Sequence, residues 1–290
     1  MSKIFEKHAF RTHFIYTLIN KKMKFQIKNI VAVMAMALAL TSCNNDDSAP
    51  AVAPDEKGTL KVEFDNVYGG ADLAFSTNYT NSNGEVIKVS KAKYIVSNIV
   101  LTKTDGSTYV IPKSESYFII DEATAASTLL NLPNIPAGDY KSIKFGIGVD
   151  QAQWALGATG QGDFLAKAQA AGMMWSWSAG YKFVAFEGTF TSLTVTTDTS
   201  YMVHTGQTGT NYNYTEVTLN FPNNALVRST ITPQVHVMAD LQHIIDGTNK
   251  ISLTSNNMGG MGAMIMGGAN LPLITSNLSN MFEVHHVHND

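Results

Sequence analysis

Histidines near the C-terminus are the side chains of this chain best suited to bind a metal ion. His285, His286 and His288 lie within the last six residues of the 290-residue sequence. In an extended strand, residues i and i+2 point to the same side, so His286 and His288 would share a face while His285 would face away. Neutral imidazole is a good ligand for Cu, Zn or Ni. This spacing predicts a metal site on His286 and His288, with His285 beside them and His204, at the end of a predicted strand, as a third nitrogen ligand. The alternative is a solvated tail.

The other histidines that follow residue 43 are predicted to be ordinary surface residues. His236 lies between Val235 and Val237 and therefore points away from the side of the strand that they occupy. His243 falls in a short polar segment that favours a helix. Neither is expected to bind a metal.

Methionines form a second group with metal-binding chemistry. Met258, Met261, Met264 and Met266 fall in the glycine-rich stretch NNMGGMGAMIMGG. Thioethers are soft ligands that favour Cu(I). The pattern predicts a place to hold or hand over Cu(I), with Met261 and Met264 as ligands and Met173 as a further candidate. The alternative is an apolar loop that lies on the core, because methionine fills gaps of irregular shape.

Two of the three tryptophans, Trp175 and Trp177, are separated by one residue. In a strand, both indoles would project from the same face. Each indole can bury roughly 150–250 Å², so the pair is predicted to form part of the core or the floor of a site. Because an indole face also suits a sugar ring, a carbohydrate-binding or adhesion lipoprotein is the alternative to a metal-binding protein.

The segment around these tryptophans resembles a known family. Gly172–Gly188 reads GMMWSWSAGYKFVAFEG, which is similar to the pattern GMxWSWxxGYKFxxxEG of the methanobactin-associated copper-binding (MbnP-like) proteins. Further segments resemble successive blocks of the same family, so that the similarity covers roughly Leu60 to the C-terminus; these are Lys93–Thr102, Ile135–Val149, Tyr201–Gly206 and Met281–Asn289.

The resemblance implies an extended β-sandwich that binds copper. It also implies a partner, a di-haem cytochrome c peroxidase-like enzyme, that oxidises a tryptophan to kynurenine; Trp175 is the favoured target and Trp177 the second. An intact indole has only an N–H donor, whereas kynurenine carries an aromatic amine that can bind a metal. In the copper-binding relatives a ligand histidine lies close in sequence to the modified tryptophan. Trp177 occupies that position here, so the local ligand pair is incomplete.

The N-terminal region carries signals for export and lipid attachment. A basic segment that begins at Met23 precedes the apolar run Ile30–Leu40, which is too short to span a bilayer and suits a signal peptide. The run ends in LTSC, which resembles a bacterial lipoprotein box with Cys43 as the lipidated residue. The sequence predicts an envelope protein that is lipid-anchored at the outer membrane.

The predicted organisation has three parts. Residues 1–42 form the signal peptide, with Met23 as the start; residues 43–58 form a flexible lipidated tether; residues 59–290 form the MbnP-like domain. The membrane is expected to be a partner only through the lipid.

Charge, cysteine content and missing motifs narrow the class of function. The leader holds seven of the 20 Lys+Arg and one of the 23 acidic residues, so the remaining chain has 13 and 22 and a charge of −9, against −3 for the whole chain. This charge argues against a nucleic-acid partner. Cys43 is the only cysteine, which excludes a disulfide framework and a thiolate metal cage. Motifs such as G-x-S-x-G and H-E-x-x-H are missing from the sequence, so we expect a binding protein and not an enzyme.

The elements that must position these side chains are predicted to be mostly strands. Alternating or β-branched patterns cover Leu60–Asp65, Lys93–Lys103, Thr108–Ile111, Lys141–Val149, Lys182–Phe190, Thr215–Phe221 and Thr230–Met238. Helical spacing covers Asp163–Ala171, with Asp163 as the cap, and short helices are possible over Ala239–Asp246 and Leu271–Met281. The pattern predicts an all-β protein, a β-sandwich that is Ig-like or extended and jelly-roll-like, with a few short helices.

Overall fold

The computed structural model describes residues 53, 55–208 and 211–290. The predicted signal peptide, Cys43 and most of the tether lie outside these residues. The remainder belongs to a unit that spans Pro50–Asp290. None of the helices found among the described residues has the length and apolar character needed to cross a membrane.

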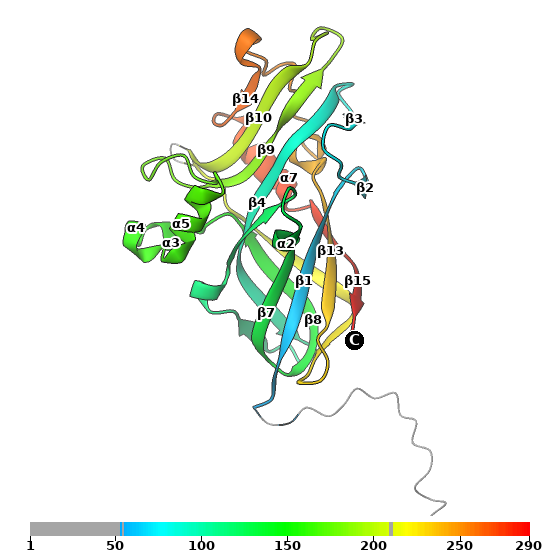
Figure 1. Cartoon of the computed structure of the whole chain (residues 1–290), viewed down its shortest axis with the longest axis vertical. Coiled ribbons are helices and arrows are strands. Elements are labelled where there is room, and N and C mark those ends of the chain that lie inside the picture. Colours follow the sequence, from blue (N-terminus) through cyan, green and yellow to red (C-terminus); the bar gives the residue numbers. More distant parts are fainter. Residues whose placement is uncertain (1–52, 54, 209–210) are drawn as a thin grey trace, which may run out of the picture. The chain divides into compact units, whose positions relative to one another are not determined.

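A smaller sheet carries the C-terminus of the chain. Within the described residues it has five strands in the order β15-β13-β1-β2, with β7 also paired to β1 (Figure 1). These strands are β1 (Lys57–Tyr68), β2 (Ala71–Asp72), β7 (Leu129–Pro136), β13 (Gln234–Asp240) and β15 (Phe282–His288). The β1–β13 pair is parallel and the β13–β15 pair is antiparallel.

A larger sheet packs against the smaller one. Its described part has ten strands, with the order β11-β10-β9-β4-β8-β12; β14 pairs with β10, and β3, β5 and β6 pair with β4. The strands are β3 (Asn78–Thr80), β4 (Val86–Lys103), β5 (Thr108–Val110), β6 (Tyr117–Asp121), β8 (Gly138–Ile147), β9 (Lys182–Thr191), β10 (Thr199–Thr208), β11 (Asn211–Tyr212), β12 (Thr215–Val227) and β14 (Ala263–Ile265).

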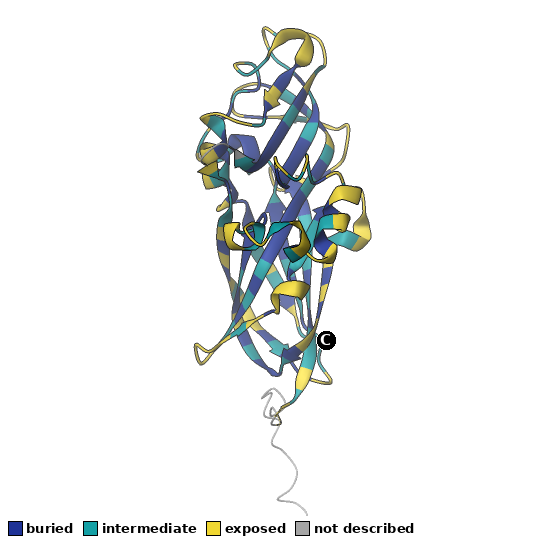
Figure 2. Cartoon of the chain, turned by 90° about the vertical axis from the view of Figure 1, so that its left-hand side faces the viewer, coloured by how far each residue is buried: buried dark blue, intermediate teal, exposed yellow. Residues whose placement is uncertain are grey.

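Aromatic side chains from both sheets meet in the core. Phe64 of β1 packs edge-on against Phe145 of β8, with ring centroids 5.5 Å apart. Phe282 of β15 packs against Phe145 and Tyr94 in the same way. Figure 2 shows the resulting alternation of buried and more exposed residues along the long strands. Burying every second side chain on each sheet leaves the opposite faces free to carry polar groups.

Helices are short and lie in the connections. They are η1 (Lys113–Glu115), α2 (Ala125–Thr128), α3 (Gln151–Trp154), α4 (Gly157–Gly160), α5 (Asp163–Ala170), α6 (His243–Asp246), η2 (Gly259–Met261) and α7 (Asn270–Leu278). The predicted cap of α5 is wrong. Gly162 precedes the helix with φ 54°, and Asp163 lies in the first turn. A carboxylate there still interacts favourably with the positive end of the helix dipole.

The all-β sandwich predicted from the sequence is confirmed, and most predicted strands coincide with observed ones. Two regions differ. The segment before Gln234 is not a strand, and it contains Pro233, which lacks a backbone donor. The second difference is that His204 lies inside β10 and not at its end.

Candidate metal site

A β-bulge in the last strand brings the C-terminal histidines to one face of the smaller sheet. His236 of β13 pairs with His286 of β15, whereas the next residue, Val237, pairs with Val284. His285 is therefore the extra residue on β15. Val284 and Val287 both pack toward the core, so His285, His286 and His288 are left on the outer face. The prediction that His285 faces away from His286 is wrong for this reason.

Four imidazoles form what we call the histidine cluster, namely His236, His285, His286 and His288. The Nδ1 atoms of His285 and His286 are 2.8 Å apart. Potential ligand atoms of His236, His285 and His286 all lie within 4.8 Å of one another, which is the only such group of three or more His, Cys, Asp or Glu among the described residues. The ring of His288 follows, 4.4 Å from that of His286 between centroids.

One of these separations is close to that expected for two nitrogens on a single ion. A metal–nitrogen bond of about 2.0–2.1 Å places two nitrogens on one ion about 2.9–3.4 Å apart when their angle is between 90° and tetrahedral. The observed 2.8 Å between His285 and His286 is close to that range. Without an ion, one of these two nitrogens must carry a proton and donate it to the other. A cation that replaced that proton would be held by both nitrogens.

His236 is the member of the cluster that the sequence did not identify. Its side chain is only 16% exposed, and its Nε2 lies 3.3 Å from Oδ2 of Asp65 on β1. Its Nδ1 is buried and has no hydrogen-bond partner. A carboxylate beside one ring nitrogen fixes the orientation of the imidazole and makes the other nitrogen a better ligand. The prediction of an ordinary surface histidine is therefore wrong.

One member of the cluster, His286, favours the neutral form. Partial burial lowers the pKa of His286, and the neighbouring His236, His288 and His285 lower it further, whereas Glu63 opposes the shift. Neutral rings keep the lone pairs that a metal needs. The nearby carboxylates of Glu63 and Asp65 would offset the charge of a bound cation.

His204 lies elsewhere, on the larger sheet. It is 97% buried on β10, and its Nε2 is 2.9 Å from Oε1 of Glu187 on β9. The hydrogen bond with His204 is the main reason why the pKa of Glu187 falls to about 2, helped by Lys91 and opposed by burial. His204 and the C-terminal histidines belong to different sheets (Figure 1). The structure does not bring them together, contrary to the prediction of a third nitrogen ligand.

Trp175 and Trp177 do not share a strand face. Residues 173–182 form a tight turn, in which the N–H of Trp175 bonds to the carbonyl of Gly180, and β9 begins only at Lys182. The ring of Trp175 lies 6.0 Å from that of His204. Trp177 instead stacks on Trp154 of α3, with centroids 4.1 Å apart. The sequence gives no sign of this, because the alternation rule holds only inside a strand.

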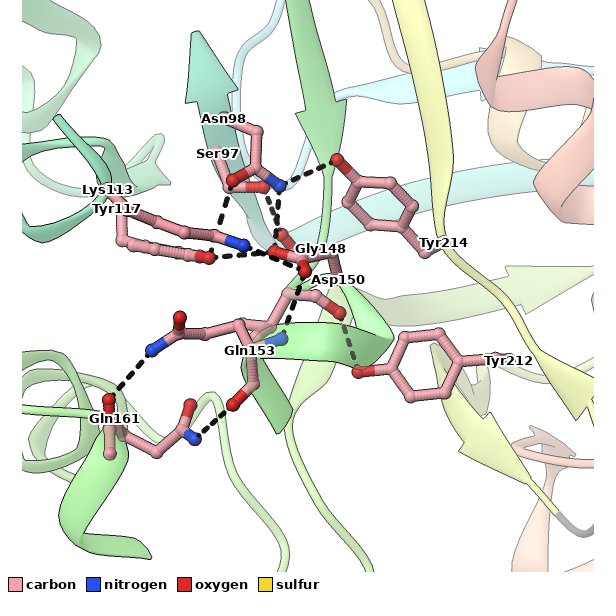
Figure 3. Close-up of polar contacts among 12 residues, drawn as sticks. Ser97, Asn98, Lys113, Tyr117, Gly148, Asp150, Gln153, Gln161, Tyr212 and Tyr214 are labelled. Atoms are coloured by element: carbon pink, nitrogen blue, oxygen red, sulfur yellow. Dashed lines mark hydrogen bonds and ion pairs between the residues drawn. The ribbon is translucent and has the colours of Figure 1, made fainter. Parts of the chain in front are cut away.

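A polar network around Asp150 holds the connection that carries both tryptophans (Figure 3). The carboxylate accepts hydrogen bonds from Asn98, Lys113, Tyr117 and the backbone N–H of Gln153, at 2.8–3.0 Å. Burial alone would raise the pKa of Asp150, but these four donors outweigh it and lower the pKa to about 2. Asn98 adopts φ 52°, a left-handed conformation that asparagine tolerates better than most residues.

The network continues into the helical insert. The hydroxyl of Tyr212 donates to the carbonyl of Val149, and the side chain of Gln161 donates to the carbonyl of Gln153. The first bond ties the segment just before the insert to β11 of the larger sheet, and the second holds the insert together internally. The sequence analysis did not single out Asp150, although Asp followed by a short helix is a capping signal.

The candidate methionines are divided. Met173 is fully buried in an apolar cluster with Phe183 and Tyr181, so its sulfur fills core space. Met258, Met261 and Met264 are exposed, and Met261 reaches 60%. Ala263 and Ile265 of the same segment are buried, so the segment packs on the core through these two residues while the three methionine side chains face outward.

A comparison with protein-family models agrees with the resemblance seen around Trp175 and Trp177. The family model for MbnP covers residues 57–265. This chain belongs to the MbnP family. The MbnP match includes His204 and the tryptophans, but it ends before β15, so the resemblance of Met281–Asn289 to a family block is not supported by it. The histidine cluster is therefore judged on its geometry.

A solved structure, MbnP from Methylosinus trichosporium, is similar to the chain. It has 16% sequence identity, covers 74% of this chain and 82% of that chain, and gives a TM-score of 0.45. A comparison with curated proteins gave no match.

Proposed function

We propose that this protein is a copper-binding lipoprotein of the cell envelope, which captures or stores copper on the histidine cluster. The observation that carries the proposal is the group of three imidazoles, His236, His285 and His286, with ligand atoms within 4.8 Å of one another. His288 stands next to them as a fourth ligand. Membership of the MbnP family supports a role related to that of the MbnP proteins.

The donor set suits copper on chemical grounds. Imidazole binds Zn, Cu, Fe and Ni, and among divalent first-row ions the affinity of a nitrogen site is greatest for Cu²⁺. Calcium and magnesium prefer oxygen ligands, which the cluster offers only at its margin through Asp65 and Glu63. The histidine cluster lies on an outer sheet face, so an ion can reach it without unfolding of the protein. These properties fit binding and release, and we propose no catalytic role.

The central experiment removes the bulge histidines. We expect His285→Ala/His286→Ala to lower the affinity for Cu²⁺ by about 100-fold or more, because second-shell losses alone cost 10–100-fold. The measurement is equilibrium dialysis with Cu, Zn and Ca offered together. The control is His243→Ala, which removes a histidine of α6 outside the group of three. A folded double variant with unchanged copper affinity would overturn the proposal.

Deleting His285 tests whether the bulge itself, beyond the imidazole of His285, contributes to copper binding. Deleting His285 restores regular alternation, so that Val284 and Val287 stay in the core and His286 and His288 stay outside. We expect this variant to fold and to lose as much copper affinity as His285→Ala. Wild-type affinity in the deletion variant would show that the bulge histidine is not a ligand.

The envelope location rests on Cys43. The proposal expects Cys43→Ser to leave the protein soluble in the periplasm or the medium, because the lipid would be attached to that thiol. Membrane fractionation after a high-salt wash measures this. Persistent membrane association of the variant would contradict the proposed anchor.

We extend the proposal to oxidation of Trp175 by a di-haem peroxidase-like partner. Two equivalents of hydrogen peroxide, each reduced to water, would supply the two oxygen atoms that cleave the C2–C3 bond of the indole to N-formylkynurenine, and hydrolysis would release the formyl carbon as formate and leave kynurenine. The indole beside His204 supports Trp175 over Trp177, which is stacked on Trp154. Peptide mapping of envelope-purified protein tests this. Unmodified tryptophan at both positions, with the partner present, would reject it.

The carbohydrate alternative loses its basis. It required Trp175 and Trp177 to form one flat platform, whereas the two rings have different neighbours.

A further inference from the structure

A cavity of about 190 Å³ lies on the smaller sheet, and its lining includes Val67 of β1, Met238 and Asp240 of β13, and Glu283 of β15. Asp240 pairs with Val67, and Met238 pairs with Glu283. Residues that pair across strands share a face of the sheet, and so do residues i and i+2 of one strand. The four side chains therefore lie on one face. It is the face of the histidine cluster, because His236 stands two residues before Met238.

Two carboxylates on this face have no cationic partner. Oδ1 of Asp240 accepts the backbone N–H groups of Gly69 and Gln242, at 2.9 and 3.1 Å, which fixes the side chain. Neither Asp240 nor Glu283 forms an ion pair with a Lys, Arg or His among the described residues. A positively charged donor forms the stronger class of hydrogen bond with a carboxylate. The cavity therefore favours a cationic ligand.

An imidazole adds a further polar group to the wall. His243 of α6 lines the cavity, and its Nδ1 is buried without a hydrogen-bond partner among the described residues. Buried polar atoms are nearly always satisfied. The wall thus contains a nitrogen that a ligand can still satisfy.

The rest of the wall is apolar and suits a carbon skeleton. Val67, Met281 and Phe282 line the cavity and are 3%, 2% and 6% exposed. An apolar cavity of about 150 Å³ holds a benzene molecule. The present cavity is therefore large enough for one ring with a short substituent, or for an alkyl chain of similar size.

A bare metal ion fits this cavity less well than an organic ligand. Ligand atoms of Asp240, His243 and Glu283 do not come within 4.8 Å of one another, since the histidine cluster provides the only such group among the described residues. A single ion needs its ligands to converge on one point. An organic ligand can instead place its charge at one end of the cavity and its carbon atoms at the other.

We propose that this cavity binds a small organic cation, an ammonium group carried on one apolar ring or a short alkyl chain. The carboxylates of Asp240 and Glu283 hold the ammonium, and the side chains of Val67 and Met281 contact its carbon part. A few polar groups in a largely apolar wall are the usual composition of a small-molecule site. The proposal does not depend on copper binding at the histidine cluster.

The test uses the mature chain with ¹³C-methyl-labelled methionine and benzylammonium as the probe. We expect benzylammonium to shift the methyl signals of Met238 and Met281 and to leave those of the exposed Met258 and Met261 unchanged. Benzyl alcohol has the same ring without the charge, and it should bind at least about fivefold more weakly.

A pair of variants removes charge inside and outside the cavity. Asp240→Asn/Glu283→Gln keeps the shape of both side chains, and the amide oxygen at position 240 can still accept the N–H groups of Gly69 and Gln242. It should weaken benzylammonium binding at least about fivefold and leave benzyl alcohol unchanged. The control Glu115→Gln/Asp163→Asn removes the same charge from exposed positions in other elements, and should change the affinity less than about twofold.

The histidine cluster is tested separately. The His285→Ala/His286→Ala variant should keep the shifts of Met238 and Met281, and their loss would place the ligand on the imidazoles instead. Equal affinities for benzylammonium and benzyl alcohol would overturn the proposal. So would unchanged benzylammonium affinity in an Asp240→Asn/Glu283→Gln variant that circular dichroism shows to be folded.

Discussion

The histidine cluster takes three of its four imidazoles from one strand, β15, whereas the His204 region combines β10, β14 and the turn that holds Trp175. We use the name His204 region for Met202, His204, Met264 and Trp175. In the histidine cluster, one β-bulge is enough to align neighbours in sequence. In the His204 region, the insert between β8 and β9 must be held in place, and the network around Asp150 does this. The comparison shows that a site built from neighbours in sequence depends on strand register. A site built from groups that are far apart in the sequence depends on a separate polar network, here the one around Asp150.

The largest effect should come from removing the Asp150 network. Asp150→Ala leaves the donors of Asn98, Lys113 and Tyr117 without an acceptor, and should lower the free energy of unfolding by about 3 kcal/mol. For a domain of this size that is a fall in Tm of about 6–12 °C. Below the transition, we expect Cu²⁺ affinity at the histidine cluster to stay within about twofold of wild type. Calorimetry measures the loss of stability and dialysis measures the copper affinity, and a loss of copper affinity as large as that of His285→Ala/His286→Ala would break the comparison.

The next effect concerns the histidine cluster alone. Asp65→Asn removes the charge that orients His236 and should lower Cu²⁺ affinity about 10–100-fold. Glu63→Gln is the matched control, since Glu63 accepts a hydrogen bond from Gln234 and not from His236. Competition with a chelator of known affinity measures the change. Equal losses in the two variants would mean that general charge, and not orientation of His236, is responsible.

Acid should weaken the Asp150 network in a defined pH range. The pKa of Asp150 is about 2 in the folded protein, below the ordinary 3.8, so its stabilisation is present above pH 3.8 and is lost as the pH falls toward 2. The contribution is about 2 kcal/mol. We expect the stability difference between wild type and Asp150→Asn in urea to shrink between pH 4 and pH 2. A constant difference over that range would contradict the assignment.

The smallest effect distinguishes the two tryptophans. Trp177→Phe weakens the ring contact with Trp154 and should cost about 1 kcal/mol of stability. Trp175→Phe leaves that contact in place and should cost less. Thermal unfolding measures the two variants side by side. Equal losses of stability in the two variants would show that the contact between Trp177 and Trp154 is not the cause.

Strand patterns made much of the fold predictable. Alternation in Leu60–Asp65 and Lys141–Val149 identified strands that the structure contains, because burial of one sheet face imposes a period of two. The pairing of His286 with His288 on one face followed from the same rule, and their rings are 4.4 Å apart. The rule failed at His285, because a bulge depends on the partner strand β13 and leaves no mark on β15 itself.

The sequence by itself determined the all-β class, the MbnP family and the inventory of imidazoles and thioethers. Tertiary structure alone decided which of them meet. His236 looked ordinary because its neighbours in space, Asp65 and His286, are far away in the chain. His204 was expected beside the C-terminal histidines, yet it lies on the other sheet with Glu187 and Trp175. The physical reason is that strand periodicity fixes the face on which a side chain lies, whereas pairing order and register fix its neighbours.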